Sequence, residues 1–174
     1  MDNIDREYER TLEMSFDAII SVDGNGLIRV WNRAAERIFG YSKEEAMGAP
    51  VEMIIPVEYR ERHREGFKGF SSTGRGRFIG DVMEVEGLRK DGSRLPIELS
   101  LTSIKINEWY ATAVVRDITE RKKLEDALER KFEETERMNR LMVGRELKIG
   151  EMKREIERLK AVIGEEGKER NPDE

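Results

Sequence analysis

The sequence predicts an α+β fold in which short helices cover one side of an antiparallel sheet and a long helix follows. Three observations predict it. A turn rich in glycine and asparagine separates two apolar runs near the N-terminus, and three later runs with strand-like alternation follow one another without a helix between them. From residue 119 onward, apolar residues instead recur at heptad spacing, which is typical of one long helix.

The composition excludes several classes of protein. Charged residues make up 40% of the 174 residues and apolar residues 37%, so part of the chain is expected to bury only a narrow apolar stripe. The lack of cysteine excludes disulfides, thiolate metal sites and cysteine nucleophiles, and a single histidine removes most other metal and acid-base sites. The net charge of -5 argues against nucleic acid as the partner. No apolar run approaches about 18 residues, which predicts a cytoplasmic protein without a membrane segment.

The N-terminal part predicts a helix followed by a hairpin. Residues 1–16 form an amphipathic pattern with apolar residues at intervals of four, which are Ile4, Tyr8, Leu12 and Phe16. AIISVDGNGLIRVWN then reads as two strands around Asp23-Gly24-Asn25-Gly26, because glycine and asparagine tolerate the positive φ of hairpin turns.

Short helices follow the hairpin. Asn32 can cap RAAERIFG, and Ser42 with Glu45 forms a capping box before another turn. VEMII is a brief element between two prolines, and VEYRERHREGFKGF predicts a longer helix that ends within Ser71 to Gly76.

VMEVEGLRK, PIELSLTSIKI and WYATAVVRD predict the other three strands. Alternation places Met83 and Val85 on one face of the first of these, so we expect Met83 to point inward. The alternation in the second slips by one residue around Thr102-Ser103, which predicts a β-bulge there.

The C-terminal region, residues 119–163, predicts a parallel two-chain coiled coil, because a narrow apolar seam must be buried on a partner helix. Lys131, Thr135 and Arg145 interrupt the seam in its middle. An exposed solitary helix is the alternative, and residues 164–174 are expected to be disordered. The a and d positions are Leu124, Leu128, Lys131, Thr135, Met138, Met142, Arg145, Ile149, Met152, Ile156, Leu159 and Ile163.

Three of these segments together resemble the PAS sensor family. They are DAIISVDGNGLIRVWNRAAERIFGYSKEEAMG, GLRKDGSRLPIELSLTSI and AVVRDITERKKLE. The resemblance implies a five-stranded antiparallel sheet with flanking short helices in residues 17–118, after the helix of residues 1–16. It also implies a sensory module that detects a small ligand, a gas or a redox state and relays it through the dimeric coiled coil.

The stretch RHREGFKGFSSTGRGRFIG is similar to the oxygen-sensing haem PAS domains of the FixL type. This narrower resemblance implies that His63 is the haem iron ligand. Met83 stands where those domains have an arginine that hydrogen-bonds oxygen, and a thioether has no proton to donate. Met83 could instead coordinate iron. The predicted cofactor-binding residues are His63, Met83, Phe67, Phe70, Tyr59, Leu99, Leu101 and Val85.

Other interpretations of these residues stay open. His63 and Met83 can be packing residues, and Trp31 can either pack or stack on a flavin ring. The alternative function is a cofactor-free scaffold of a two-component system that dimerises or docks a partner. We expect a homodimer through residues 119–163 and a downstream kinase or other signalling protein as partner. No enzyme activity is expected, because the region after Thr119 has no histidine to serve as a kinase phosphoacceptor.

Overall fold

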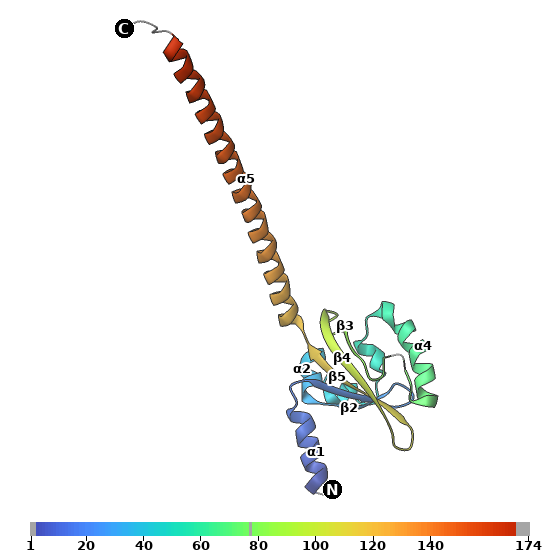
Figure 1. Ribbon diagram of the computed structural model, residues 1–174. Coiled ribbons are helices and arrows are strands. Elements are labelled where there is room, and N and C mark those ends of the chain that lie inside the picture. Colours follow the sequence, from blue (N-terminus) through green and yellow to red (C-terminus); the bar gives the residue numbers. More distant parts are fainter. Residues whose placement is uncertain (1–2, 77, 170–174) are drawn as a thin grey trace. The chain divides into compact units, whose positions relative to one another are not determined.

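The computed structural model describes residues 3–76 and 78–169 (Figure 1). They form two compact units, which divide between Lys123 and Leu124. The first unit begins with α1 (Asn3–Met14) and the hairpin of β1 (Ala18–Val22) and β2 (Ile28–Trp31). The helical elements that follow are α2 (Arg33–Phe39), α3 (Lys43–Ala46), the 3₁₀ helix η1 (Val51–Ile54) and α4 (Val57–Thr73). The remaining strands are β3 (Val82–Leu88), β4 (Arg94–Lys105) and β5 (Trp109–Asp117).

The five strands form one antiparallel sheet, as the sequence predicted. The structure adds their order, which is β2-β1-β5-β4-β3. The last strand therefore lies in the centre of the sheet and pairs with the first. Ala18, Ile20 and Val22 of β1 share the inner face with Val115 of β5, and all four are buried. These side chains pack against Phe39 of α2, which is also buried.

Asp23 explains why the chain turns between β1 and β2. Its Oδ1 accepts hydrogen bonds from the backbone N–H groups of Asn25 and Leu27, and its Oδ2 binds Arg29. Gly26 takes a φ of 76°, a conformation that other residues rarely adopt. The predicted hairpin turn is confirmed.

The predicted helix caps are also confirmed. The side chain of Asn32 accepts a hydrogen bond from the N–H of Ala35 at the start of α2. Ser42 and Glu45 form both hydrogen bonds of a capping box. Helix α4 ends at Thr73, and Gly74 follows in the left-handed conformation.

The predicted bulge at Thr102-Ser103 is wrong. The pairing of β4 with β5 runs without interruption from Ile97 opposite Asp117 to Lys105 opposite Trp109. The apolar pattern slips because Ile104 and Ile106 are apolar but exposed. At these positions an apolar residue therefore does not mark the inner face of the sheet. The register shift lies instead between Ser21 and Val22, where β1 pairs with β2.

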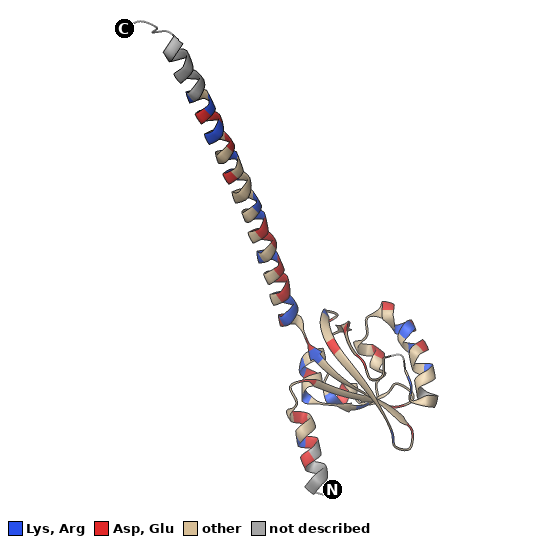
Figure 2. Cartoon of the chain, in the orientation of Figure 1, with Lys and Arg blue, Asp and Glu red and all other residues tan. Residues whose placement is uncertain are grey.

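The second unit consists of the rest of α5 (Thr119–Glu169). Figure 2 shows acidic and basic positions distributed along this helix. The helix includes residues 164–169, for which the composition predicted a disordered tail, and residues 170–174 lie outside the described residues. The apolar seam residues from Leu124 to Leu159 are exposed in the single chain, so their pairing stays a prediction.

Among the described residues, no helix combines the length and the apolar character needed to span a bilayer.

Candidate functional site

Helix α4 carries the histidine of the candidate site. Its spacing places His63, Phe67 and Phe70 on one face, as predicted. The ring centroids of His63 and Phe67 are 5.7 Å apart, and those of Phe67 and Phe70 are 5.2 Å apart. Phe70 is buried, whereas His63 and Phe67 are partly exposed beside a cavity.

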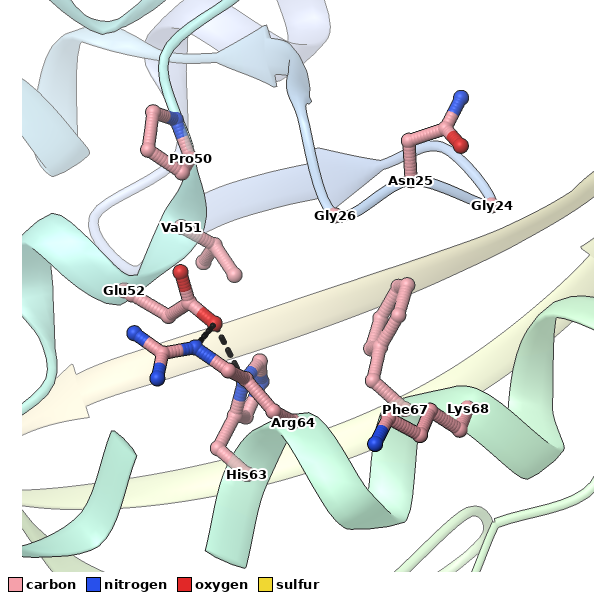
Figure 3. A pocket seen from close by; sticks show the side chains of 10 residues that line it. All are labelled: Gly24, Asn25, Gly26, Pro50, Val51, Glu52, His63, Arg64, Phe67 and Lys68. Carbon is pink, nitrogen blue, oxygen red and sulfur yellow. Dashed lines mark hydrogen bonds and ion pairs between the residues drawn. The ribbon is translucent and has the colours of Figure 1, made fainter. Parts of the chain in front are cut away.

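The cavity has a volume of about 340 Å³ and lies between α4, η1 and the β1–β2 turn (Figure 3). The ring of Phe67 points toward Gly26 in the turn, where a Cβ atom would lie 3.8 Å from the phenyl Cε1. The lining residues are Gly24, Asn25, Gly26, Pro50, Val51, Glu52, His63, Arg64, Phe67 and Lys68.

The carboxylate of Glu52 faces Arg64 and His63 in the cavity wall (Figure 3). Its Oε1 is 3.1 Å from Nε of Arg64 and 4.0 Å from Nδ1 of His63. The second distance is too long for a hydrogen bond, and Nδ1 is a buried nitrogen without a hydrogen-bond partner among the described residues. An unmade hydrogen bond at a buried polar atom is costly, so this nitrogen marks a strained point in the cavity wall.

Burial lowers the pKa of His63 below its usual value of 6.5, although the negative charge of Glu52 acts in the opposite direction and Arg64 lowers it further. The imidazole is therefore neutral at neutral pH and has one nitrogen that donates and one that accepts hydrogen bonds.

Most of the predicted cofactor-binding residues do not line this cavity. Only His63 and Phe67 do. Met83 pairs with Leu99 on the inner face of the sheet, and Val85 pairs with Ile97. Trp31 is fully buried in the core and donates its indole N–H to the carbonyl of Tyr41, so its ring is not available to stack on a flavin. The others that are absent from the lining are Tyr59, Phe70, Leu99 and Leu101.

Sequence reasoning missed four polar lining residues, which are Asn25, Glu52, Arg64 and Lys68. They lie on three separate elements, and only the tertiary structure brings them together. A local signal did exist for Arg64 and Lys68, because they are four residues apart and each directly follows a residue of the face that carries His63 and Phe67.

The described residues fit a small polar ligand better than haem. The cavity lies at the low end of the range of about 300 to 1,000 Å³ for small-molecule sites. Charged side chains from Glu52, Arg64 and Lys68 occupy its wall, whereas a porphyrin needs a wide apolar slot. His63 as an iron ligand stays a prediction.

Acidification is expected to destabilise the protein through His63. The pKa of His63 is lower in the folded protein than in the unfolded chain, so the unfolded chain binds the proton more readily. Stability is thus kept above about pH 6.5 and lost as the pH falls toward the folded pKa. Urea unfolding at pH 7.5 and pH 5.8 should show a larger loss for the wild-type protein than for His63→Gln, and equal losses would contradict the assignment.

The position of the last strand between β1 and β4 is the most distinctive feature of the sheet, because the residues before α5 then belong to a strand that is paired on both sides. Together with the helices on one side of the sheet, this arrangement defines the chain as an α+β domain with an attached helix. The chain belongs to the family described as the PAS fold, whose model matches residues 6–118.

Two curated relatives are similar to the chain over this region. The Sensor protein FixL of Bradyrhizobium diazoefficiens is 36% identical over 126 residues, which are 72% of this chain and 25% of FixL. The cell-division control histidine kinase PdhS of Brucella ovis is 29% identical over 131 residues, which are 75% of this chain and 13% of PdhS. The chain thus spans a quarter or less of either relative. Its PAS domain is thus similar to regions of a sensor protein and of a histidine kinase, which is consistent with a role in sensory signal transduction.

A solved structure supports the fold. The PAS domain of a protein from Colwellia psychrerythraea matches with a TM-score of 0.57 and 30% sequence identity, over 68% of this chain and 99% of that one.

Proposed function

We propose that this chain is a cytoplasmic sensory module that binds a small ligand in the cavity beside His63 and passes the change to a paired α5. The observation that carries the proposal is the junction at Asp117, where the central strand β5 becomes α5. The carboxylate of Asp117 accepts a hydrogen bond from the backbone N–H of Thr119 at 2.8 Å and forms an ion pair with Arg89 at 2.9 Å.

Arg89 connects the junction to the rest of the domain, because it also donates a hydrogen bond to the carbonyl of Ile38 in α2. Burial acts to raise the pKa of Asp117, but hydrogen bonds from Thr119 and Arg89 outweigh it and lower the pKa. Ile118 is buried, and its N–H donates to the carbonyl of Pro96 in β4. A shift of β4 or β5 therefore moves the start of α5 directly.

The cavity can produce such a shift because α4 packs against β5. Gly74, which ends α4, lies against the ring of Trp109 at the start of β5. A ligand that draws His63 or Phe67 toward the β1–β2 turn would tilt α4. The tilt would change how Gly74 packs against Trp109. In the proposed mechanism, the ligand acts by favouring one of two packings of the sheet and its helices.

The paired state of α5 is the second part of the proposal. The seam residues are apolar and exposed in one chain, and a second copy buries them best. Lys131, Thr135 and Arg145 interrupt the apolar seam, so this segment stabilises one packing of the helix pair less strongly. Two packings of the helix pair can therefore compete there. The relatives include a histidine kinase, which supports a kinase or another signalling protein as the downstream partner.

Single-cysteine variants test the pairing. The chain has no cysteine of its own, so each variant carries one thiol. In a parallel, in-register pair, Met138→Cys and Ile149→Cys both place two thiols at the seam, and both are expected to form disulfide-linked dimers on mild oxidation. Leu147→Cys, on the outer side of the pair, is the matched control and should crosslink at least about tenfold more slowly.

The same variants test the switch. In the presence of His63→Ala, the ratio of the crosslinking rates at residues 138 and 149 is expected to change, because the cavity then biases the helix pair differently. If the two rates respond identically, signalling through α5 is wrong. If neither position crosslinks, α5 forms no parallel, in-register pair.

Absorbance separates a haem sensor from a cofactor-free module. A Soret band in freshly purified protein that is lost in His63→Ala would establish haem, and a yellow colour with flavin fluorescence would indicate flavin. The unpartnered Nδ1 and the polar cavity lead us to expect a colourless protein. A colourless protein whose crosslinking is unchanged by His63→Ala would favour the dimerising scaffold instead.

A further inference from the structure

We infer that a row of ion pairs on the outer face of the sheet couples the chain where it enters the domain to the first turn of α5, so that the domain also relays an input from its N-terminal side. We call it the outer-face row. It consists of Asp17 just before β1, of Arg116, Glu98 and Glu84 on the sheet, and of Arg121 and Lys122 on α5.

Strand register brings the sheet residues of the row together. Glu84 of β3 lies opposite Glu98 of β4, and Glu98 lies opposite Arg116 of β5. Asp17 directly precedes Ala18, which pairs with Val115. Glu84, Glu98 and Arg116 lie on the face of the sheet opposite to the core, because the buried residues of β3, β4 and β5 are their odd-numbered neighbours. Asp17 lies on the same side, because it precedes the buried Ala18 and binds Arg116.

Arg116 is shared between two carboxylates. It makes two hydrogen bonds with Asp17, from Nε to Oδ1 at 3.0 Å and from Nη2 to Oδ2 at 2.7 Å. Its remaining nitrogen, Nη1, is 4.0 Å from Oε1 of Glu98. Glu98 is therefore the weaker partner of Arg116 while Asp17 is in place.

Glu98 is shared in turn between Arg116 and α5. Nη2 of Arg121 is 3.5 Å from Oε2 of Glu98 and 2.7 Å from Oε1 of Glu84. Lys122 contributes a further contact of 2.7 Å from Nζ to Oε2 of Glu84. The hydrogen bond with Lys122 is the largest cause that lowers the pKa of Glu84.

Glu84 and Glu98 are two carboxylates on opposite positions of neighbouring strands, so they need a basic side chain from the first turn of α5. Like charges directly opposite each other on neighbouring strands are destabilising. Arg121 lies within reach of both carboxylates and relieves their repulsion only while the first turn of α5 is docked. The row therefore favours the docked state of this turn.

Because Arg116 and Glu98 each bind two partners, a change at Asp17 can be passed on to α5. When Asp17 moves away, the guanidinium of Arg116 loses its two hydrogen bonds and turns to Glu98, its nearest other carboxylate. Glu98 then holds Arg121 less strongly, and the first turn of α5 loosens. Asp17 is itself tied to the end of α1, because the amide of Asn32 binds the carbonyls of both Asp17 and Leu12. A displacement of α1 thus reaches α5 without any change in the cavity.

Hydrogen exchange on the full chain tests the relay. The amide of Lys122 donates to the carbonyl of Ile118 at 2.9 Å and reports on the first turn. In Asp17→Asn, exchange of the amides of residues 120–123 is expected to be about two- to fivefold faster, the range for partly exposed ion pairs. Glu65→Gln, which removes an exposed carboxylate of α4, is the control and should leave these amides unchanged.

A second variant separates the relay from local loosening. In Glu98→Gln the middle of the row is missing, so adding Asp17→Asn should no longer accelerate exchange in α5. The relay is refuted if Asp17→Asn affects only α1 and β1, or if it has the same effect with and without Glu98. His63→Ala should leave the result intact, which keeps this inference separate from the proposed ligand response.

Discussion

Replacing Asn32 with alanine is expected to lower the free energy of unfolding by about 3 kcal/mol, because the change leaves several buried polar groups unpaired. The side chain is 1% exposed and makes four hydrogen bonds to the backbone. Its Oδ1 accepts from the N–H groups of Ile19 and Ala35 at 3.0 Å each. Its Nδ2 donates to the carbonyls of Leu12 at 2.9 Å and Asp17 at 3.1 Å.

Urea unfolding followed by circular dichroism measures this loss. Asn107→Ala, which truncates an exposed asparagine in the β4–β5 turn, is the control and should change stability by less than about 0.5 kcal/mol. Asn32→Asp should destabilise at least as much as the alanine variant, since it places a carboxylate oxygen against two carbonyl oxygens. An alanine variant as stable as the control would show that these hydrogen bonds are not what joins α1 to the sheet.

Gly74→Ala is expected to destabilise the protein by about 3 kcal/mol and to disturb the end of α4. Gly74 has a φ of 66°, which costs other residues about 1 to 2 kcal/mol. A Cβ atom there would also overlap Cδ2 and Cε3 of Trp109, so the indole ring must move. The second effect adds an overpacking cost of about 1 to 3 kcal/mol.

Gly48→Ala separates the two effects in the same unfolding measurement. Gly48 has a φ of 77°, but a Cβ atom added there would meet no other atom within 4 Å, so its substitution should cost only the backbone strain of about 1 kcal/mol. Adding Trp109→Ala to Gly74→Ala should remove the overlap and give a loss smaller than the sum of the single variants. Equal losses for Gly74→Ala and Gly48→Ala would mean that the contact between α4 and β5 is loose, and the proposed path from the cavity to α5 would fail with it.

Local rules were sufficient for most of the secondary structure. Gly26 and Asp23 specify the hairpin turn, and Asn32 and Ser42 specify two helix starts, because each acts on backbone groups within a few residues of itself. The bulge prediction failed for the converse reason. Ile104 is apolar but exposed near the end of its strand, and sequence alternation cannot distinguish the two faces of a sheet at its margin.

The amino-acid sequence by itself determined the order of the elements, the antiparallel sheet, the face of α4 that carries His63, and the apolar seam of α5. Only the tertiary structure decided the surroundings of His63, which lines one cavity with Glu52 and the β1–β2 turn, whereas Met83 does not line that cavity. It also decided that Asp17 and Arg121 belong to one row of charges. The physical reason is that periodicity fixes the direction of a side chain relative to its own element, whereas its partners depend on strand register and helix packing between residues far apart in the chain.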